Sequence, residues 1–127
     1  MFYIVESSKS FHEATFDLEP VVQRLGFVVL HTHKLGEILQ HKGIDIDEEC
    51  QVFDVGNYRY MERMLAIDAK LGLMLPWRIL VFTEDGATKI GLTRPARLLA
   101  AFGDKPGLAR LLDEIEEKLI LIVDEIR

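Results

Sequence analysis

The sequence predicts an α+β fold, a two-layer sandwich in which an antiparallel or mixed sheet of about five strands is covered by helices. Short aromatic and β-branched runs alternate with longer segments of helical apolar spacing. Two of the β-branched runs are joined by an Asp-Gly pair that is typical of a hairpin, which disfavours a purely parallel sheet. The length of 127 residues, of which 49% are hydrophobic, predicts one domain over residues 1–127.

The start of the chain predicts one strand followed by one helix. Phe2–Val5 is a short aromatic and β-branched run, as in a strand. Ser10 and Glu13 have the spacing of a capping box, and apolar residues then recur at helical intervals. Pro20 lies inside this helix and predicts a kink or a local break, because proline has no backbone donor. Gly26 follows the last apolar residue and predicts the end of the helix.

The middle of the chain predicts two strands and two further helices. The strands are Phe27–His33 and Cys50–Val55, with a short helix over Lys34–His41 between them. Asn57 is placed to cap a longer helix over Tyr58–Leu71. The residues of that helix expected to face the core are Met61, Met64, Leu65 and Ile67.

The end of the chain predicts a hairpin and a long helix. Arg78–Thr83 and Thr88–Leu92 are the hairpin strands, and apolar residues then recur at helical spacing from Leu108 to Ile126. Further apolar residues lie outside this stripe, namely Leu112, Ile120, Leu121 and Val123. They indicate either deep burial against the sheet or a contact between the two copies of a dimer.

Charge and cysteine content restrict the classes of function. Fifteen Lys and Arg against twenty-one Asp and Glu give a formal charge of −6, which argues against nucleic-acid or anionic-membrane partners. No secretory signal and no apolar stretch of membrane-spanning length occurs, so we expect a cytoplasmic protein. The single cysteine, Cys50, excludes an internal disulfide framework, and its acidic neighbours favour an unreactive thiol.

The familiar cofactor and nucleophile motifs are missing from the sequence, and we predict no cofactor. Neither a glycine-rich phosphate loop nor a G-x-S-x-G elbow is present. His31 and His33 share one side of a strand and are weak metal candidates, with His12, His41 or Cys50 as a third ligand. The simpler interpretation is that both are ordinary strand residues, and we predict no metal site.

The segment from Val52 to Arg78 has the densest arrangement of residues suited to binding. It joins a strand end to a helix N-terminus, which offers backbone donors to an anion. Aromatic side chains would line a pocket there and arginines would fix a carboxylate or phosphate. The candidate binding residues are Asp54, Asn57, Tyr58, Arg59, Pro76, Trp77 and Arg78. Separately, each of them also has a purely structural interpretation as a cap, a turn or a core residue.

The same motifs resemble a known family, domain of unknown function 302. The matching residues, in order, are Ser10-Phe11, Gly26–Leu30, Asn57, Leu65, Asp68, Leu71–Leu73 and Leu75-Pro76. They cover most of residues 3–95, and the C-terminal helix fits by its apolar spacing alone. The resemblance implies a small α+β fold that assembles as homodimers, without an established reaction. Many members have cysteines where this chain has Gly56 and Trp77, and a proline at Tyr58, so any thiol chemistry of those members is expected to be missing here.

Three functions remain open from the sequence. The first is a non-catalytic homodimeric interaction module. The second is a small-molecule binder with its pocket near Asn57, Trp77 and Arg78. The third is an enzyme in which Asp54 or Glu62 would act as general base and an arginine would stabilise an oxyanion. Because no catalytic spacing is present, an enzyme is the least favoured of the three.

Overall fold

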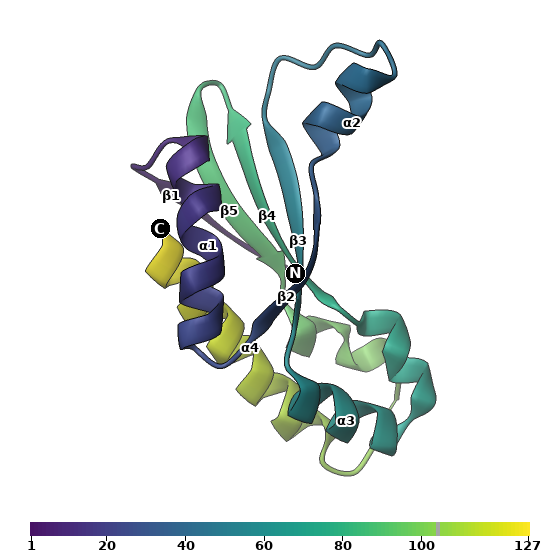
Figure 1. The fold of residues 1–127 in the computed structure, drawn as a ribbon. Coiled ribbons are helices and arrows are strands. Elements are labelled where there is room, and N and C mark those ends of the chain that lie inside the picture. The colour runs from purple at the N-terminus through teal and green to yellow at the C-terminus, as the bar shows by residue number, and fades with distance from the viewer. Residues whose placement is uncertain (104) are drawn as a thin grey trace.

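A computed structural model describes residues 1–103 and 105–127, and its centre is a five-stranded sheet (Figure 1). The strands are β1 (Phe2–Ser7), β2 (Val28–His33), β3 (Cys50–Gly56), β4 (Trp77–Glu84) and β5 (Ala87–Thr93). They lie in the order β1-β5-β4-β3-β2, and every neighbouring pair is antiparallel. The predicted α+β class is therefore confirmed, with an antiparallel sheet.

The helices lie over one face and beyond both ends of the sheet. They are α1 (Phe11–Arg24), α2 (Leu35–His41), α3 (Tyr58–Ile67) and α4 (Leu108–Ile126), with 3-10 segments η1 (Ala69–Met74) and η2 (Pro95–Ala101). Helices α1 and α4 lie side by side, whereas α2 projects at one end and α3 lies at the other (Figure 1). None of the helices in the described part of the chain is long and apolar enough to span a membrane.

The core lies between the sheet and the pair α1 and α4. Val55, Ile79 and Ile90 point from the sheet into this layer and are fully buried. The buried residues of α4 are Leu108, Leu111, Leu112, Ile115, Glu116, Leu119, Ile122, Val123 and Ile126. Deep burial therefore accounts for the wide apolar surface of this helix, and Leu121 is the member of the extra group that remains exposed, at 48%.

Local signals in the first helix act as the sequence predicts, with one exception. The Glu13 N–H donates to Ser10 Oγ at 3.1 Å and the Ser10 N–H donates to Glu13 Oε1 at 3.3 Å, which forms the capping box. Gly26 ends the segment with φ +87°, a conformation that favours glycine. Of the kink or local break predicted at Pro20, the break is wrong, because α1 is continuous from Phe11 to Arg24. Pro20 is exposed and removes one backbone donor, which the rest of the helix tolerates.

The third helix is shorter than predicted. It ends at Ile67, because Asp68 is extended and its Oδ1 accepts a hydrogen bond from the Lys70 N–H at 2.9 Å. This bond starts η1 and lowers the pKa of the Asp68 carboxyl from its usual value. The prediction that Leu65 faces the core is also wrong, since it is 46% exposed and Tyr60 takes a buried place beside Met64.

The hairpin between β4 and β5 has a two-residue turn. Asp85 has φ +53° and Gly86 has φ +81°, and Glu84 pairs with Ala87 across the turn. Positive φ at both central positions is the type I′ geometry that matches the twist of the strands. The Asp-Gly signal is therefore confirmed.

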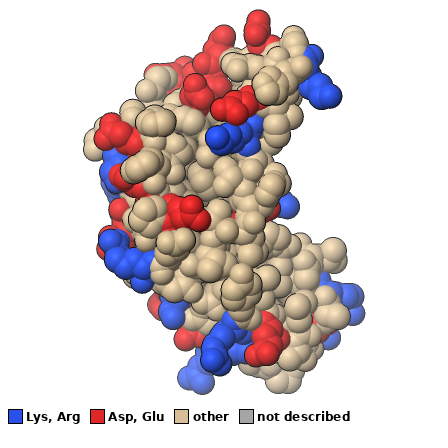
Figure 2. All heavy atoms as spheres, viewed as in Figure 1, with Lys and Arg blue, Asp and Glu red and all other residues tan. Residues whose placement is uncertain are grey.

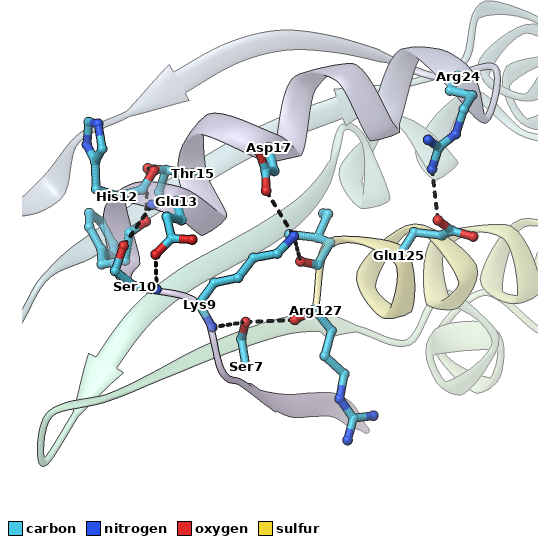
Figure 3. A network of polar contacts seen from close by, with 12 residues as sticks. Ser7, Lys9, Ser10, His12, Glu13, Thr15, Asp17, Arg24, Glu125 and Arg127 are labelled. Atoms are coloured by element: carbon cyan, nitrogen blue, oxygen red, sulfur yellow. Dashed lines mark hydrogen bonds and ion pairs between the residues drawn. The ribbon is translucent and has the colours of Figure 1, made fainter.

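Polar contacts hold the end of α4 against the first strand and helix (Figure 3). Ser7 Oγ donates to the Arg127 carbonyl at 2.9 Å, and Lys9 Nζ donates to the Ile126 carbonyl at 2.8 Å. Lys9 Nζ also lies 2.9 Å from the carboxylate of Asp17. Because these contacts satisfy the last carbonyls of α4, they fix the end of that helix against β1 and the start of α1.

Candidate functional site

The face of the sheet opposite α1 and α4, here called the open face, is apolar at its centre. Alternation along each strand directs every second side chain to this face. Phe2 and Ile4 of β1 are 67% and 52% exposed, although both are large apolar residues. Val52, Leu80 and Phe82 continue the surface across β3 and β4, and all of them border a shallow hollow of about 250 Å³.

Gly91 allows the hollow to form between β1 and β4. It pairs with Ile4 and Leu80 on its two sides. A Cβ atom at this position would lie 3.0 Å from Ile4 Cγ1, so any larger residue would displace the isoleucine. The glycine therefore lets Ile4 lie across the open face.

A charged cluster borders the apolar part of the open face. Asp54 is buried, with Oδ2 2.8 Å from His33 Nε2 and Oδ1 3.4 Å from Arg78 Nε. Both carboxylate oxygens therefore already have a partner. A general base needs an oxygen directed at a substrate, so this arrangement suits a structural ion pair better than the catalytic role considered for Asp54.

The two strand histidines lie close together without forming a metal centre with a third residue. The rings of His31 and His33 are 4.5 Å apart between centroids and are nearly perpendicular. In the described ranges 1–103 and 105–127, no group of three His, Cys, Asp or Glu side chains is arranged to hold a metal ion. His33 instead directs Nε2 at Asp54.

The residues predicted at the α3 N-terminus lie away from the open-face hollow. Asn57 Oδ1 accepts from the Tyr60 N–H at 3.0 Å, and Asn57 Nδ2 donates to the Gly26 carbonyl at 3.0 Å. Tyr58 is 67% exposed. Arg59 borders a separate shallow hollow that it shares with Asn57. The capping interpretation of Asn57 is thus confirmed by its hydrogen bonds.

Replacing Asn57 by alanine is expected to lower the free energy of unfolding by about 1 kcal/mol, because the first turn of α3 loses its cap. Urea denaturation followed by circular dichroism measures this. Tyr58→Ala, next to it and without a capping bond, is expected to change the value by less than about 0.5 kcal/mol. Equal effects of the two substitutions would contradict the capping role.

The remaining predicted site residues, Pro76, Trp77 and Arg78, lie at the start of β4. They border a hollow of about 170 Å³ between η1 and η2. Trp77 is 5% exposed and packs edge-on against Phe27, with ring centroids 6.0 Å apart. Its Nε1 has no hydrogen-bond partner within the described part of the chain. The seven predicted residues are therefore divided among three places and do not surround one cavity.

The positions of the family cysteines are occupied by packing contacts. A Cβ atom at Gly56 would lie 2.8 Å from Leu30 Cδ1 and 3.0 Å from Met61 Sδ, so these side chains fill the space a cysteine would need. The single cysteine of this chain, Cys50, lies at the other end of β3 from Gly56. Burial raises the pKa of the Cys50 thiol, which agrees with the predicted low reactivity although the cause is desolvation and not acidic neighbours.

Comparisons with known proteins give one consistent result. Residues 3–126 match the family described as domain of unknown function DUF302. A crystal structure described as an uncharacterized conserved protein DUF302 from Bacillus stearothermophilus is 32% identical, with a TM-score of 0.93 over 99% of this chain and 98% of that chain. None of the curated proteins matches this chain. The resemblance seen in the sequence motifs is confirmed, and it extends beyond residue 95 through α4.

Proposed function

The chain belongs to the DUF302 family, a domain of unknown function, and on that premise we propose that it is a non-catalytic interaction module that forms a homodimer. The single observation that carries the proposal is the apolar open face, where Phe2, Ile4, Val52, Leu80 and Phe82 lie together without being buried. Apolar patches of this kind mark interaction surfaces on proteins. The occupant we propose is a second copy of the chain.

The area of the open face is large enough to form most of an interface with a second copy of the chain. Five strands about 4.8 Å apart and about six residues long cover roughly 24 Å by 20 Å, or about 480 Å² of flat surface. Stable interfaces bury about 800 Å² on each partner. The open face therefore supplies more than half of a standard interface before the relief of its side chains is counted.

The charged cluster at the border of the open face is compatible with a second copy covering that face. Asp54 is already paired with His33 and Arg78, so a partner would cover a satisfied carboxylate. An unpaired buried charge would oppose association strongly, whereas a paired one costs much less. A small-molecule pocket around Asn57 and Trp77 is less well supported, because these two residues border different hollows.

Size-exclusion chromatography with light scattering tests the homodimer. At micromolar concentration the expected mass is about 29 kDa, which is twice the chain mass of 14.5 kDa. A mass of 14.5 kDa across the range from 1 to about 100 μM would overturn the proposal, because the open face would then be exposed in the free protein.

A further inference from the structure

We propose that the two copies pair antiparallel, with a projecting arm of each copy lying over the basic end of its partner's sheet. The arm is residues 34–49, which comprise α2 and the loop to β3. The basic end is the opposite end of the sheet, where exposed Lys70, Arg78 and Arg97 lie on η1, β4 and η2. This inference rests on the proposed homodimer and adds its orientation and a second contact surface.

The arm has apolar residues that its own chain does not cover. Helix α2 has no buried residue, and Leu35, Ile38 and Ile44 are 37%, 49% and 49% exposed. A helix of seven residues is too short to be stable in water unless it packs on another surface. The arm therefore offers the additional apolar area that the flat sheet lacks for a standard interface.

The charge of the arm differs from that of the other end of the sheet. Residues 34–49 contain two lysines and five acids, which gives a formal charge of −3 with histidine neutral. The acids are Glu37, Asp45, Asp47, Glu48 and Glu49. On the side shown in Figure 2, acidic atoms gather around the top, where Figure 1 places the arm. Half of the net charge of −6 is thus on one projecting segment.

The register of the sheet separates the arm from the basic residues. Cys50, which follows the arm, pairs with Phe82, whereas Arg78 pairs with Asp54 near the other end of β3. The arm and Arg78 thus belong to opposite ends of the same open face. Arg78 is 68% exposed and contacts Asp54 through Nε, so its terminal nitrogens remain available to carboxylates of a partner.

Charge complementarity selects between the two limiting orientations in which two open faces stack. A two-fold axis along the strands would lay each arm over the same end of the partner's sheet at its opposite edge, where the exposed acids Glu84 and Asp85 form the β4–β5 turn, so acidic groups would face acidic groups. An axis across the strands brings each arm over the basic end of the other copy, and it does so twice because the contact is symmetric. Like charges across an interface are unfavourable, so the antiparallel arrangement is selected.

Charge reversal in full-length protein tests this orientation. The arm variant carries Asp45→Lys and Asp47→Lys, the end variant carries Lys70→Glu and Arg97→Glu, and a third chain carries all four changes. At about 50 mM salt we expect the first two each to raise the dimer Kd at least about tenfold, and the third to return it to within about threefold of the unaltered chain. Sedimentation equilibrium measures the Kd values, and circular dichroism verifies the fold of each variant.

The outcomes separate the orientation from the homodimer itself. Unchanged Kd values for the arm and end variants, or no recovery in the third chain, would overturn the antiparallel pairing while a dimeric unaltered chain still supported the proposed function. A monomeric unaltered chain would overturn both. Weaker dimers of both the arm and the end variant, with recovery in the third chain, support the pairing. In the other orientation each reversal would relieve a like-charge contact, so neither variant would raise the dimer Kd.

Discussion

Replacing Leu80 by aspartate is expected to convert the homodimer into a monomer. Leu80 lies on the central strand β4, borders the open-face hollow and has a neighbour in Val52 across the sheet. In a symmetric dimer each copy would place one unpaired carboxylate into an apolar contact. Such a charge costs several kcal/mol, so the dimer Kd should rise about 1,000-fold or more, and sedimentation equilibrium measures it.

Leu121→Asp is the matched control for that substitution. Leu121 is an exposed leucine on α4, the helix whose additional apolar residues indicate an alternative dimer contact in the sequence. The same chemical change there is expected to leave the dimer Kd unaltered. If Leu121→Asp dissociated the dimer and Leu80→Asp did not, the interface would lie on α4 and the open face would lose its proposed role.

Ile115→Ala is expected to produce the largest loss of stability among single truncations considered for α4. Ile115 is fully buried in the layer between this helix and the sheet. Removing its outer carbons loses transfer free energy and leaves a cavity, which together cost about 2–5 kcal/mol of unfolding free energy. Urea denaturation at a fixed protein concentration measures the change, since dimerisation also contributes to apparent stability.

Leu121→Ala, on the same helix, is expected to change the free energy of unfolding by less than about 0.5 kcal/mol. A similar loss for both substitutions would mean that the exposed side of α4 is covered in the assembly. That result would contradict the assignment of α4 to the core of one copy.

Local signals in the sequence predicted most of the fold. The Ser10 capping box, the Asp85-Gly86 turn and the apolar stripe of α4 each depend on neighbours a few residues apart. The end of α3 was missed because it depends on the backbone of Asp68, which is extended to cap η1. An aspartate inside an apolar helical pattern signals such a cap, since its side chain competes for nearby backbone donors.

The candidate site was predicted less well, because it depends on which face each residue takes. Trp77 and Arg78 are consecutive in β4, so the Trp77 ring is buried on the core side against Phe27, while the Arg78 side chain points to the open face. Alternation along a strand is visible in sequence and could have separated them. The apolar open face was harder to find, because Leu80 and Val81 are both apolar and sequence alone does not say which of them a helix covers.

The register in which β2 pairs with β3 could not be predicted from the sequence either. An irregularity between Val29 and His31 places an extra residue, Leu30, against Gly56. Bulges of this kind redirect a side chain, and they depend on tertiary packing more than on residue type. This bulge places Leu30 in the space that a cysteine at position 56 would need. Motif comparison shows that Gly56 differs from the family pattern, but it does not give this structural reason.

Radical footprinting of phenylalanine side chains tests the central claim, the covering of the open face by a second copy, most directly. Phe2 on that face and Phe16 on α1 are 67% and 75% exposed in one copy, which makes them a matched pair. On raising the concentration from dilute monomer to dimer, labelling of Phe2 is expected to fall at least about threefold while that of Phe16 stays constant. Equal labelling of both in a sample that light scattering shows to be dimeric would contradict the account.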